Sequence, residues 1–125
     1  MTTREHVDVL ILGAGLSGIG AAARLGQEHP DRGYLVLEAR GASGGTWDLF
    51  RYPGIRSDSD MFTLGYRFKP WLGDRALADG PSILDYVRET AREHDVERRI
   101  RYQHTVVAAD WDSAAAHWTV TAAAS

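Results

Sequence analysis

The chain begins with alternating aliphatic and polar stretches that predict three successive elements. Residues 7–12 (VDVLIL) form an aliphatic run that stops at a glycine, which is typical of a strand buried on both faces of a parallel sheet. From Leu16 to Glu28 the apolar residues recur at helical spacing, and Pro30 then prevents continuation of the helix. Tyr34 to Glu38 (YLVLE) is a second aliphatic run. The pattern predicts a right-handed βαβ unit with two parallel strands.

The middle of the chain predicts a long loop followed by a helix. Residues 41–60 are rich in glycine, serine and aspartate, so we expect a loop there. A loop of this length inside a compact domain usually has a function. A helix is predicted from Ser82 to His94, because Ser82 and Asp85 resemble a capping box and an apolar helical face follows.

The last third of the chain predicts a β-hairpin. Two strands are expected over Ile100–Trp111 and His117–Thr121, joined by the small and polar residues 112–116. No third long βα unit follows within the 125 residues. We therefore expect the α/β class and a Rossmann-like FAD/NAD(P)-binding fold. In this fold a parallel sheet with a βαβ unit carries an appended β-hairpin and is incomplete at the C-terminus.

Residues 13–18 (GAGLSG) match the GxGxxG pattern of dinucleotide-binding folds, in its required place between a strand and a helix. Gly13 allows the tight turn, Gly15 lets the backbone approach a pyrophosphate, and Gly18 allows close packing of helix on strand. The N-terminus of the helix adds free N–H groups and a partial positive charge. In this context the motif predicts a bound dinucleotide rather than a chance glycine turn.

Glu38 is the candidate ribose ligand. It follows Gly18 by 20 residues and ends the second predicted strand, where a carboxylate can accept hydrogen bonds from both adenosine-ribose hydroxyls. The same charge repels a ribose 2′-phosphate, so the site is expected to hold FAD or NAD and to reject NADP. The alternative is a solvated glutamate at a strand end. The pattern alone does not separate FAD from NAD.

Composition excludes several other classes of function. The 17 acidic and 14 basic residues give a net charge of −3, without the basic stripe that a nucleic-acid-binding protein needs. The absence of cysteine excludes a disulfide framework and a thiolate metal site and fits a cytoplasmic protein. The five histidines lack metal-ligand spacing, so no metal site is expected. We expect neither a targeting nor a transmembrane segment, and the sequence does not decide membrane association.

Residues 44–60 (GGTWDLFRYPGIRSDSD) resemble the N-terminal fingerprint of flavin-containing Baeyer-Villiger monooxygenases. The shared features are a glycine pair, a tryptophan, an aromatic-proline-glycine turn and an aspartate. They are Gly44, Gly45, Trp47, Tyr52, Pro53, Gly54 and Asp58. The stretch FTLGYRFKPW at residues 62–71 is similar to the branch that includes the ethionamide-activating monooxygenases. The resemblance covers nearly the whole chain and implies FAD as the cofactor of this first site.

The resemblance also implies a role for each residue around the cofactor. The set that lines the pyrophosphate is Gly13, Gly15, Ser17 and Gly18, with Glu38 on the ribose. The set along the ribityl and pyrophosphate side is Thr46, Trp47, Asp48 and Leu49. Asp58 is implied to approach the flavin ring and to have a catalytic role, and the backbone of Val106 to meet the adenine.

Two of these positions have a structural alternative. Trp47 offers a large flat surface to a ligand, and the alternative, which is the weaker one, is a core aromatic residue. Trp71, Trp111 and Trp118 are assigned to packing. For Asp58 and Asp60 the alternative is a helix N-cap ahead of Met61, and for Asp60 this alternative is nearly as strong as any functional role.

Members of the resembled family use NADPH to reduce FAD, and then O2 to convert a ketone into an ester or lactone or to oxygenate sulfur. They carry a second glycine-rich motif for NADPH, an FxGxxxHxxxW-type linker and an arginine of the catalytic centre, none of which occurs in residues 1–125. We therefore expect residues 1–125 to be the N-terminal portion of an FAD-binding domain, inactive alone, with the NADPH-binding domain outside this chain.

Two other functions stay open from the sequence. One is a different FAD-dependent oxidoreductase, such as a dehydrogenase or disulfide reductase. The absence of cysteine and the GGTW…YPG loop weigh against it. The other is a nucleotide-binding fragment without turnover of its own.

Overall fold

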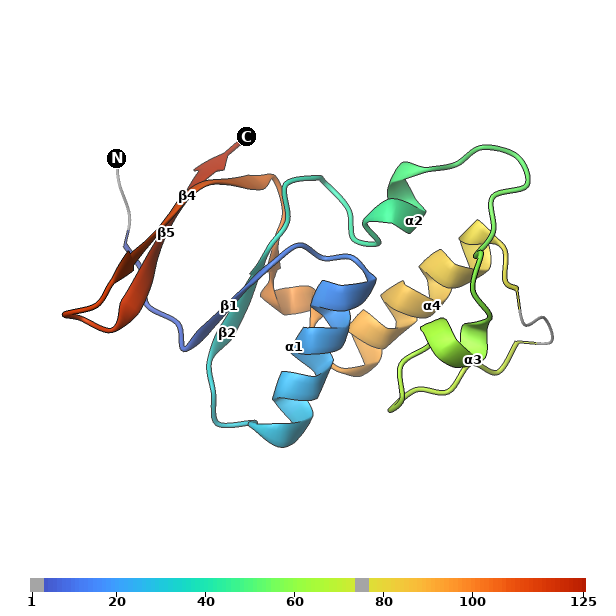
Figure 1. Ribbon diagram of the computed structural model, residues 1–125, viewed down its shortest axis with the longest axis horizontal. Helices are drawn as coiled ribbons and strands as arrows, with labels where there is room; N and C mark the ends of the chain where they lie inside the picture. Colours follow the sequence, from blue (N-terminus) through green and yellow to red (C-terminus); the bar gives the residue numbers. More distant parts are fainter. Residues whose placement is uncertain (1–3, 74–76) are drawn as a thin grey trace.

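The computed structural model describes residues 4–73 and 77–125. Within them a parallel sheet of three strands lies between two helices and a β-hairpin (Figure 1). The sheet has the order β1-β2-β3, and the hairpin is a separate two-stranded sheet. The elements are β1 Val9–Leu12, α1 Leu16–Glu28, β2 Tyr34–Leu37, α2 Thr46–Leu49, α3 Met61–Leu64, α4 Gly80–Glu93, the 3₁₀ turn η1 Glu97–Arg99, β3 Ile100–Arg101, β4 His104–Asp112 and β5 His117–Ala124.

The predicted βαβ unit is confirmed. β1 pairs with β2 in parallel, with Val9 opposite Tyr34 and Leu12 opposite Leu37. The helix between them has the predicted bounds, Leu16–Glu28, and its last residue precedes His29-Pro30. β1 begins at Val9, two residues later than the aliphatic run at residues 7–12 predicted. The local pattern was sufficient to predict these elements because the apolar residues that define each one lie within that element.

A hydrophobic core fills the space between the sheet and helices α1 and α4, which lie side by side (Figure 1). Fully burying an aliphatic side chain of this size stabilises a fold by roughly 1.5–3 kcal/mol. The largest apolar side chains with almost no exposed surface are Ile19, Val36, Met61, Ile83, Val87 and Val96. Because they come from both helices, the sheet and the connecting segments, the core holds the glycine turn and the long loop in one unit.

The run Ile100–Trp111 is not one strand, so that prediction was wrong. Ile100–Arg101 is β3, which extends the parallel sheet by pairing with Val36 and Leu37 of β2. Gln103 then adopts a left-handed backbone with φ of +59°, and β4 begins at His104 in the other sheet. A β-forming composition continues across this break. The change of pairing partner therefore leaves no signal in the pattern.

The hairpin that follows is confirmed. β4 and β5 pair antiparallel, with Asp112 opposite His117 across the turn. Trp111 and Trp118 face each other with ring centroids 5.5 Å apart, but their exposed fractions are 51% and 62%. They pack on one another rather than in the core. Trp71 packs edge-on against Tyr86 at the margin of the core, as its assignment to packing requires.

Two helices differ from the prediction. The loop over residues 41–60 contains a one-turn helix, α2. The predicted helix at Ser82 starts earlier, at Gly80, and Asp79 is its N-cap, since the Asp79 carboxylate accepts the backbone N–H of Ser82 over 2.9 Å. The Ser82-Asp85 capping box is therefore wrong. Asp79 was overlooked because glycine and proline follow it, although proline suits the first turn of a helix.

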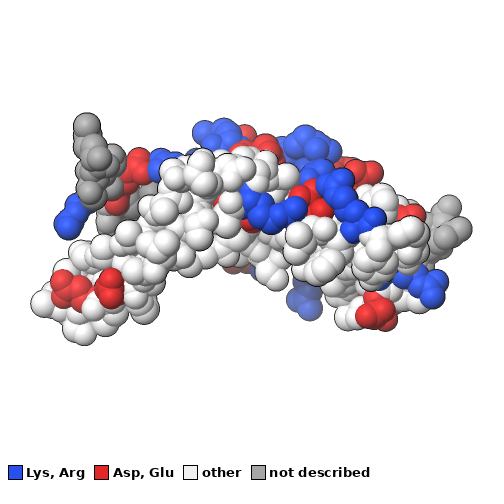
Figure 2. Space-filling view, turned by 90° about the horizontal axis from the view of Figure 1, so that it is seen from above, with Lys and Arg blue, Asp and Glu red and all other residues white. Residues whose placement is uncertain are grey.

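Charged side chains of both signs are interspersed along one edge of the molecule (Figure 2). The hairpin end of the same view is largely uncharged except for acidic side chains near its tip (Figure 2). In the described part of the chain, no group of histidine or acidic side chains is arranged to hold a metal ion. Over the same residues, no helix is long and apolar enough to cross a membrane.

Candidate cofactor site

The glycine motif forms a tight turn between β1 and α1. Gly13 has φ of +104°, a backbone conformation that favours glycine. Its N–H donates to Leu37 O over 2.8 Å, which ties the turn to the end of β2. A Cβ at Gly18 would lie 1.9 Å from Gly13 O, so the first turn of α1 can pack on the loop only without a side chain there. The predicted structural reasons for Gly13 and Gly18 are therefore both observed.

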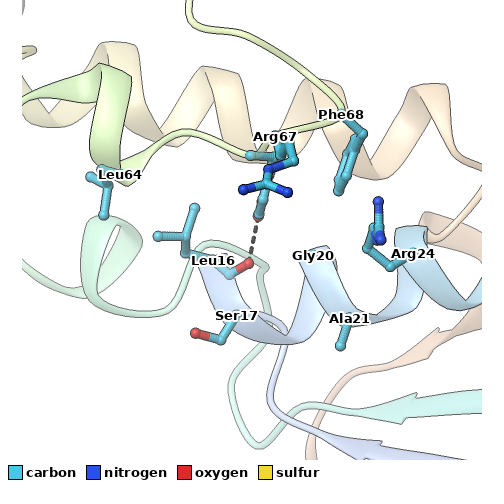
Figure 3. Close-up of a pocket in the computed structure, with 9 residues that line it drawn as sticks. Leu16, Ser17, Gly20, Ala21, Arg24, Leu64, Arg67 and Phe68 are labelled. Carbon is cyan, nitrogen blue, oxygen red and sulfur yellow. Dashed lines mark hydrogen bonds between the residues drawn. The ribbon is translucent and has the colours of Figure 1, made fainter.

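The N-terminus of α1 is open toward solvent. Gly15 is its N-cap, and among residues 4–73 and 77–125 this end of the helix has no side-chain cap hydrogen bond. That turn also carries no acidic residue. Figure 3 shows the exposed Ser17 on the first turn of α1, among the residues that line a groove beside this helix. The free N–H groups of a helix of thirteen residues therefore remain available to an anion.

A second glycine turn packs directly on the first. Gly44 N–H donates to Ala14 O over 2.8 Å. Gly44 and Gly45 both have positive φ, of +118° and +55°. A Cβ at Gly45 would lie 3.0 Å from the Cα of Gly15. Two segments that are 30 residues apart in the sequence thus bring bare backbone to one place.

Glu38 lies beside both turns and is only 7% exposed. Its Oε1 accepts the N–H of Ala14 over 2.8 Å, and its Oε2 accepts the N–H of Arg40 over 2.9 Å. Each carboxylate oxygen has a further lone pair, so ribose hydroxyls can still be accepted. The solvated-glutamate alternative does not describe this buried side chain.

α2 directs its four side chains to different surroundings. Asp48 is 4% exposed, whereas Leu49 is 55% exposed. Thr46 and Trp47 line a hollow of about 440 Å³, and Trp47 also packs against the core. Tyr52 and Asp58 line the same hollow. The predicted ribityl-side residues are thus contiguous in the structure, but only Thr46 and Trp47 line the hollow.

The two aspartates before α3 have different surroundings. Asp60 is the N-cap of α3, and its carboxylate accepts the N–H of Thr63 over 2.9 Å. The capping alternative is therefore observed for Asp60. Asp58 lies outside the cap, exposed at the wall of the hollow that contains Trp47.

A second groove, of about 580 Å³, runs between α1 and residues 64–68 (Figure 3). Tyr66 Oη donates to Leu16 O over 2.5 Å across it, and the Tyr66 ring stacks on those of Phe68 and Tyr86 with centroids 5.0 and 5.5 Å apart. Burial raises the pKa of the Tyr66 hydroxyl well above its usual range. This tyrosine anchors the segment after α3 to the start of α1.

Asp48 is the centre of an arginine cluster that the sequence did not indicate. Its carboxylate pairs with Arg40 at 2.9 Å, with Arg88 at 2.7 Å and with Arg51. Burial raises the pKa of Asp48, but hydrogen bonds and charge from Arg51 and Arg88 lower it more, so the net shift is downward. Arg40 follows Glu38 by two residues, a position that could have drawn attention. Arg88 lies on α4, far away in the sequence, with no local signal.

Val106 lies apart from the glycine turns, half-buried on β4. Its strand starts next to Glu38, because His104 N–H donates to Glu38 O over 3.0 Å. A β-bulge follows, between Val106 and Ala108. The residue predicted to contact the adenine therefore lies on a strand that begins beside Glu38.

The sequence family described as NAD(P)-binding Rossmann-like domain matches residues 11–74. This stretch holds both glycine turns, Glu38 and the whole loop up to α3. The chain belongs to this family. Membership confirms the predicted Rossmann-like fold.

One sequence relative and two solved structures give a more specific comparison than the family does. The chain is 57% identical over 116 residues to the FAD-containing monooxygenase EthA of Mycobacterium tuberculosis, an alignment that covers 93% of this chain and 24% of EthA. The structure is similar to that of an oxidized steroid monooxygenase bound to NADP, with a TM-score of 0.84, 32% identity and coverage of 93% and 23%. It is also similar to OTEMO in complex with FAD and NADP, with a TM-score of 0.82, 32% identity and coverage of 96% and 23%.

These similarities confirm the resemblance to flavin-containing monooxygenases that the loop motif indicated. The chain spans about a quarter of the length of the relatives it matches. The similarity therefore concerns one part of those proteins.

Proposed function

We propose that this chain binds FAD as the N-terminal portion of an FAD-binding domain, within an NADPH- and O2-dependent flavoprotein monooxygenase. The observation that supports this most directly is the meeting of two glycine turns at the open N-terminus of α1, beside the buried carboxylate of Glu38. This arrangement fits a pyrophosphate next to a ribose. The similarity to FAD-containing monooxygenases favours FAD over NAD.

The pyrophosphate would be held by backbone rather than by side chains. Gly13, Gly15 and Gly18 keep the turn narrow, and the N–H groups at the start of α1, including that of Ser17, supply the positive end of the helix dipole. The Gly44-Gly45 backbone would close the other side. A Cβ at Gly15 would be in ordinary contact with Gly45, 3.5 Å from its Cα, so glycine is needed there for a ligand more than for the fold.

Glu38 would accept the ribose hydroxyls and set the choice of nucleotide. Its carboxylate is already fixed by two backbone N–H groups, so its oxygens do not have to be ordered when the cofactor binds. A 2′-phosphate would bring like charges together, which disfavours NADP at this site. Val106 would contact the adenine by its backbone, from the strand that begins beside Glu38.

The flavin end would extend along the loop and into the hollow that contains Trp47. Thr46 and Trp47, which line this hollow, would follow the ribityl chain, with the backbone of Asp48 and Leu49 continuing the same turn. Asp58 would lie near the flavin ring. When bound, FAD supplies the redox and oxygen chemistry, while these residues bind it, orient it and limit access of water.

For the whole enzyme we propose oxygenation of a ketone to an ester or lactone, or oxygenation of a sulfur compound, with NADPH bound by a domain outside this chain. The lack of cysteine supports a cytoplasmic location. The 125-residue chain alone should show no NADPH-dependent oxygenation, because its sequence carries no second glycine-rich nucleotide motif. Turnover by the purified chain with NADPH, O2 and FAD would contradict this.

The test of FAD binding is the substitution Gly15→Ala. The added methyl group meets protein only at van der Waals distance, so the ligand-free fold should lose less than about 1 kcal/mol, the difference expected at an N-cap. FAD affinity should fall at least ~10-fold, about 1.4 kcal/mol, because the methyl group blocks backbone approach. Gly26→Ala, in open space on the same helix, is the control. Wild-type chain that shows no flavin absorbance and no FAD-dependent rise in melting temperature would refute the proposal.

A further inference from the structure

Arg88 reaches both sides of the Gly44-Gly45 turn from α4. Its Nη2 donates to Ser43 O over 2.8 Å, just before the turn, and to the Asp48 carboxylate over 2.7 Å, just after it. α4 packs beside α2, so this guanidinium joins a helix of the core to the second glycine turn (Figure 1). The Arg88 side chain is 31% exposed, and Asp48 is almost fully buried.

Arg40 makes a similar connection from the other side. It leaves the end of β2 two residues after Glu38, and its Nη1 contacts Asp48 Oδ2 at 2.9 Å and Gly45 O at 3.4 Å. Arg51 completes the cluster through the carboxylate and carbonyl of Asp48. Three guanidiniums against one carboxylate leave an excess of positive charge beside the turn.

The position of the turn matters because its clearance is small. A Cβ at Gly45 would lie 3.0 Å from the Cα of Gly15, and one hydrogen bond, from Gly44 N–H to Ala14 O, joins the two turns directly. A pyrophosphate that binds both turns needs their spacing fixed to a fraction of an ångström. The Arg88–Asp48 pair joins the segment after the second turn to α4 of the core.

We propose that Asp48 and Arg88 are positioning residues for the cofactor: they hold the Gly44-Gly45 backbone against Gly15, so that the pyrophosphate subsite exists before the cofactor binds. This rests on the proposed FAD-binding function. The Asp48 side chain then acts through the turn. Its carboxylate supports the cofactor site without direct contact with FAD, which explains why Asp48 belongs to the predicted cofactor-binding residues. The surplus positive charge of the cluster adds attraction for the pyrophosphate.

The variant that tests this is Arg88→Lys, which keeps the charge but shortens the side chain. One terminal nitrogen of Arg88, Nη2, donates both bonds, and the ammonium of the shorter lysine side chain does not occupy the position of that nitrogen. Arg92→Lys, on the exposed side of the same helix, is the matched control. Arg88→Met removes the charge as well, and it separates the geometric effect from the electrostatic one.

Three measurements on the 125-residue chain decide the outcome. FAD and ADP, which share the pyrophosphate, should each bind ~10-fold more weakly to Arg88→Lys than to Arg92→Lys, at similar ligand-free melting temperatures. Without ligand, the amide of Gly44 should exchange hydrogen faster in Arg88→Lys, because its bond to Ala14 O opens more often. Equal affinity and equal Gly44 exchange in the two variants would overturn the inference.

The same measurements separate this inference from the function on which it rests. Wild-type chain that binds ADP but not FAD would refute the FAD proposal, while the ADP and exchange data still test the positioning role. If Arg88→Met does not fold, Arg88→Lys carries the comparison. A fall in melting temperature with unchanged Gly44 exchange and unchanged affinity would reduce the pair to a structural contact and overturn the proposal.

Discussion

The carboxylate of Glu38 accepts the backbone N–H of Ala14 over 2.8 Å, which joins the end of the second strand to the first glycine turn. The residue proposed to bind the ribose therefore also holds the turn proposed to bind the pyrophosphate. Such a bond between a charged acceptor and a backbone N–H is roughly twice as strong as a neutral one. Changing Glu38 should affect both subsites together.

Glu38→Gln should weaken FAD binding by at least ~10-fold, about 1.4 kcal/mol, and lower the stability of the ligand-free protein. The amide keeps one oxygen but presents an NH₂ group to either Ala14 N–H or Arg40 N–H, so one buried donor loses its acceptor. Titration with FAD and urea unfolding measure the two effects. Glu28→Gln, in an exposed ion pair of α1, should change neither appreciably. An unaltered FAD affinity in Glu38→Gln would argue against the ribose assignment.

Gly20 and Gly26 lie on the same helix but should respond in opposite ways to alanine. A Cβ at Gly20 would lie 2.6 Å from the Tyr66 ring, which is held by stacking and by its bond to Leu16 O. Gly20→Ala should therefore destabilise the fold by roughly 1–3 kcal/mol through overpacking. Gly26 faces open space, so Gly26→Ala should stabilise the helix by roughly 0.5–1 kcal/mol. Urea unfolding of both variants gives the comparison, and equal effects would be inconsistent with a rigid Tyr66 anchor.

Asp58 and Asp60 offer a contrast between function and stability. Asp60→Ala should cost about 1 kcal/mol of stability, because it removes the acceptor of Thr63 N–H at the start of α3. Asp58→Ala should leave stability within about 0.5 kcal/mol, as at other exposed positions. In a protein that joins residues 1–125 to an NADPH-binding domain, Asp58→Ala should keep FAD but lose at least ~10-fold in flavin reduction or product formation. Normal turnover in Asp58→Ala would remove its catalytic role.

The Asp48 cluster predicts a dependence of stability on pH. Because its neighbours hold the folded-state pKa of Asp48 below the ordinary value of 3.8, its contribution is fully present above that pH. The contribution is lost as the pH falls through the folded-state pKa. The difference in unfolding free energy between wild type and Asp48→Asn should therefore be constant at neutral pH and shrink below pH 3.8. Asp31→Asn, at an exposed position, controls for the loss of a carboxylate, and a gap that widens in acid would contradict the sign.

The sequence predicted those parts of the molecule that are encoded by neighbouring residues. The βαβ unit follows from two aliphatic runs and one helical repeat, and the glycine turn follows from the steric needs of Gly13 and Gly18. The break at Gln103 was not predictable, because a strand that changes its partner keeps the same β-forming composition. Asp79 was missed as a cap in favour of Ser82, three residues later.

The candidate site shows the same division. Glu38 was identified because its spacing from the glycines is constrained by the fold, but its bond to Ala14 needed the tertiary structure. Asp48 entered the predicted set through the loop resemblance, without its partners. Arg88 is 40 residues away, and only the packing of α4 brings it to the carboxylate. Contacts between distant segments cannot be predicted from local sequence patterns.

The left-handed residue Gln103 marks both the exit and the return of the hairpin. Ser125 N–H donates to Gln103 O over 2.8 Å, so the chain comes back to the point where it left the parallel sheet. β4 and β5 thus form an excursion from the parallel sheet whose two ends meet. We expect that residues added in cross-strand pairs near its tip would leave Glu38 and the parallel sheet in place. The hairpin therefore leaves the parallel sheet and returns to it at a single point, beside Gln103.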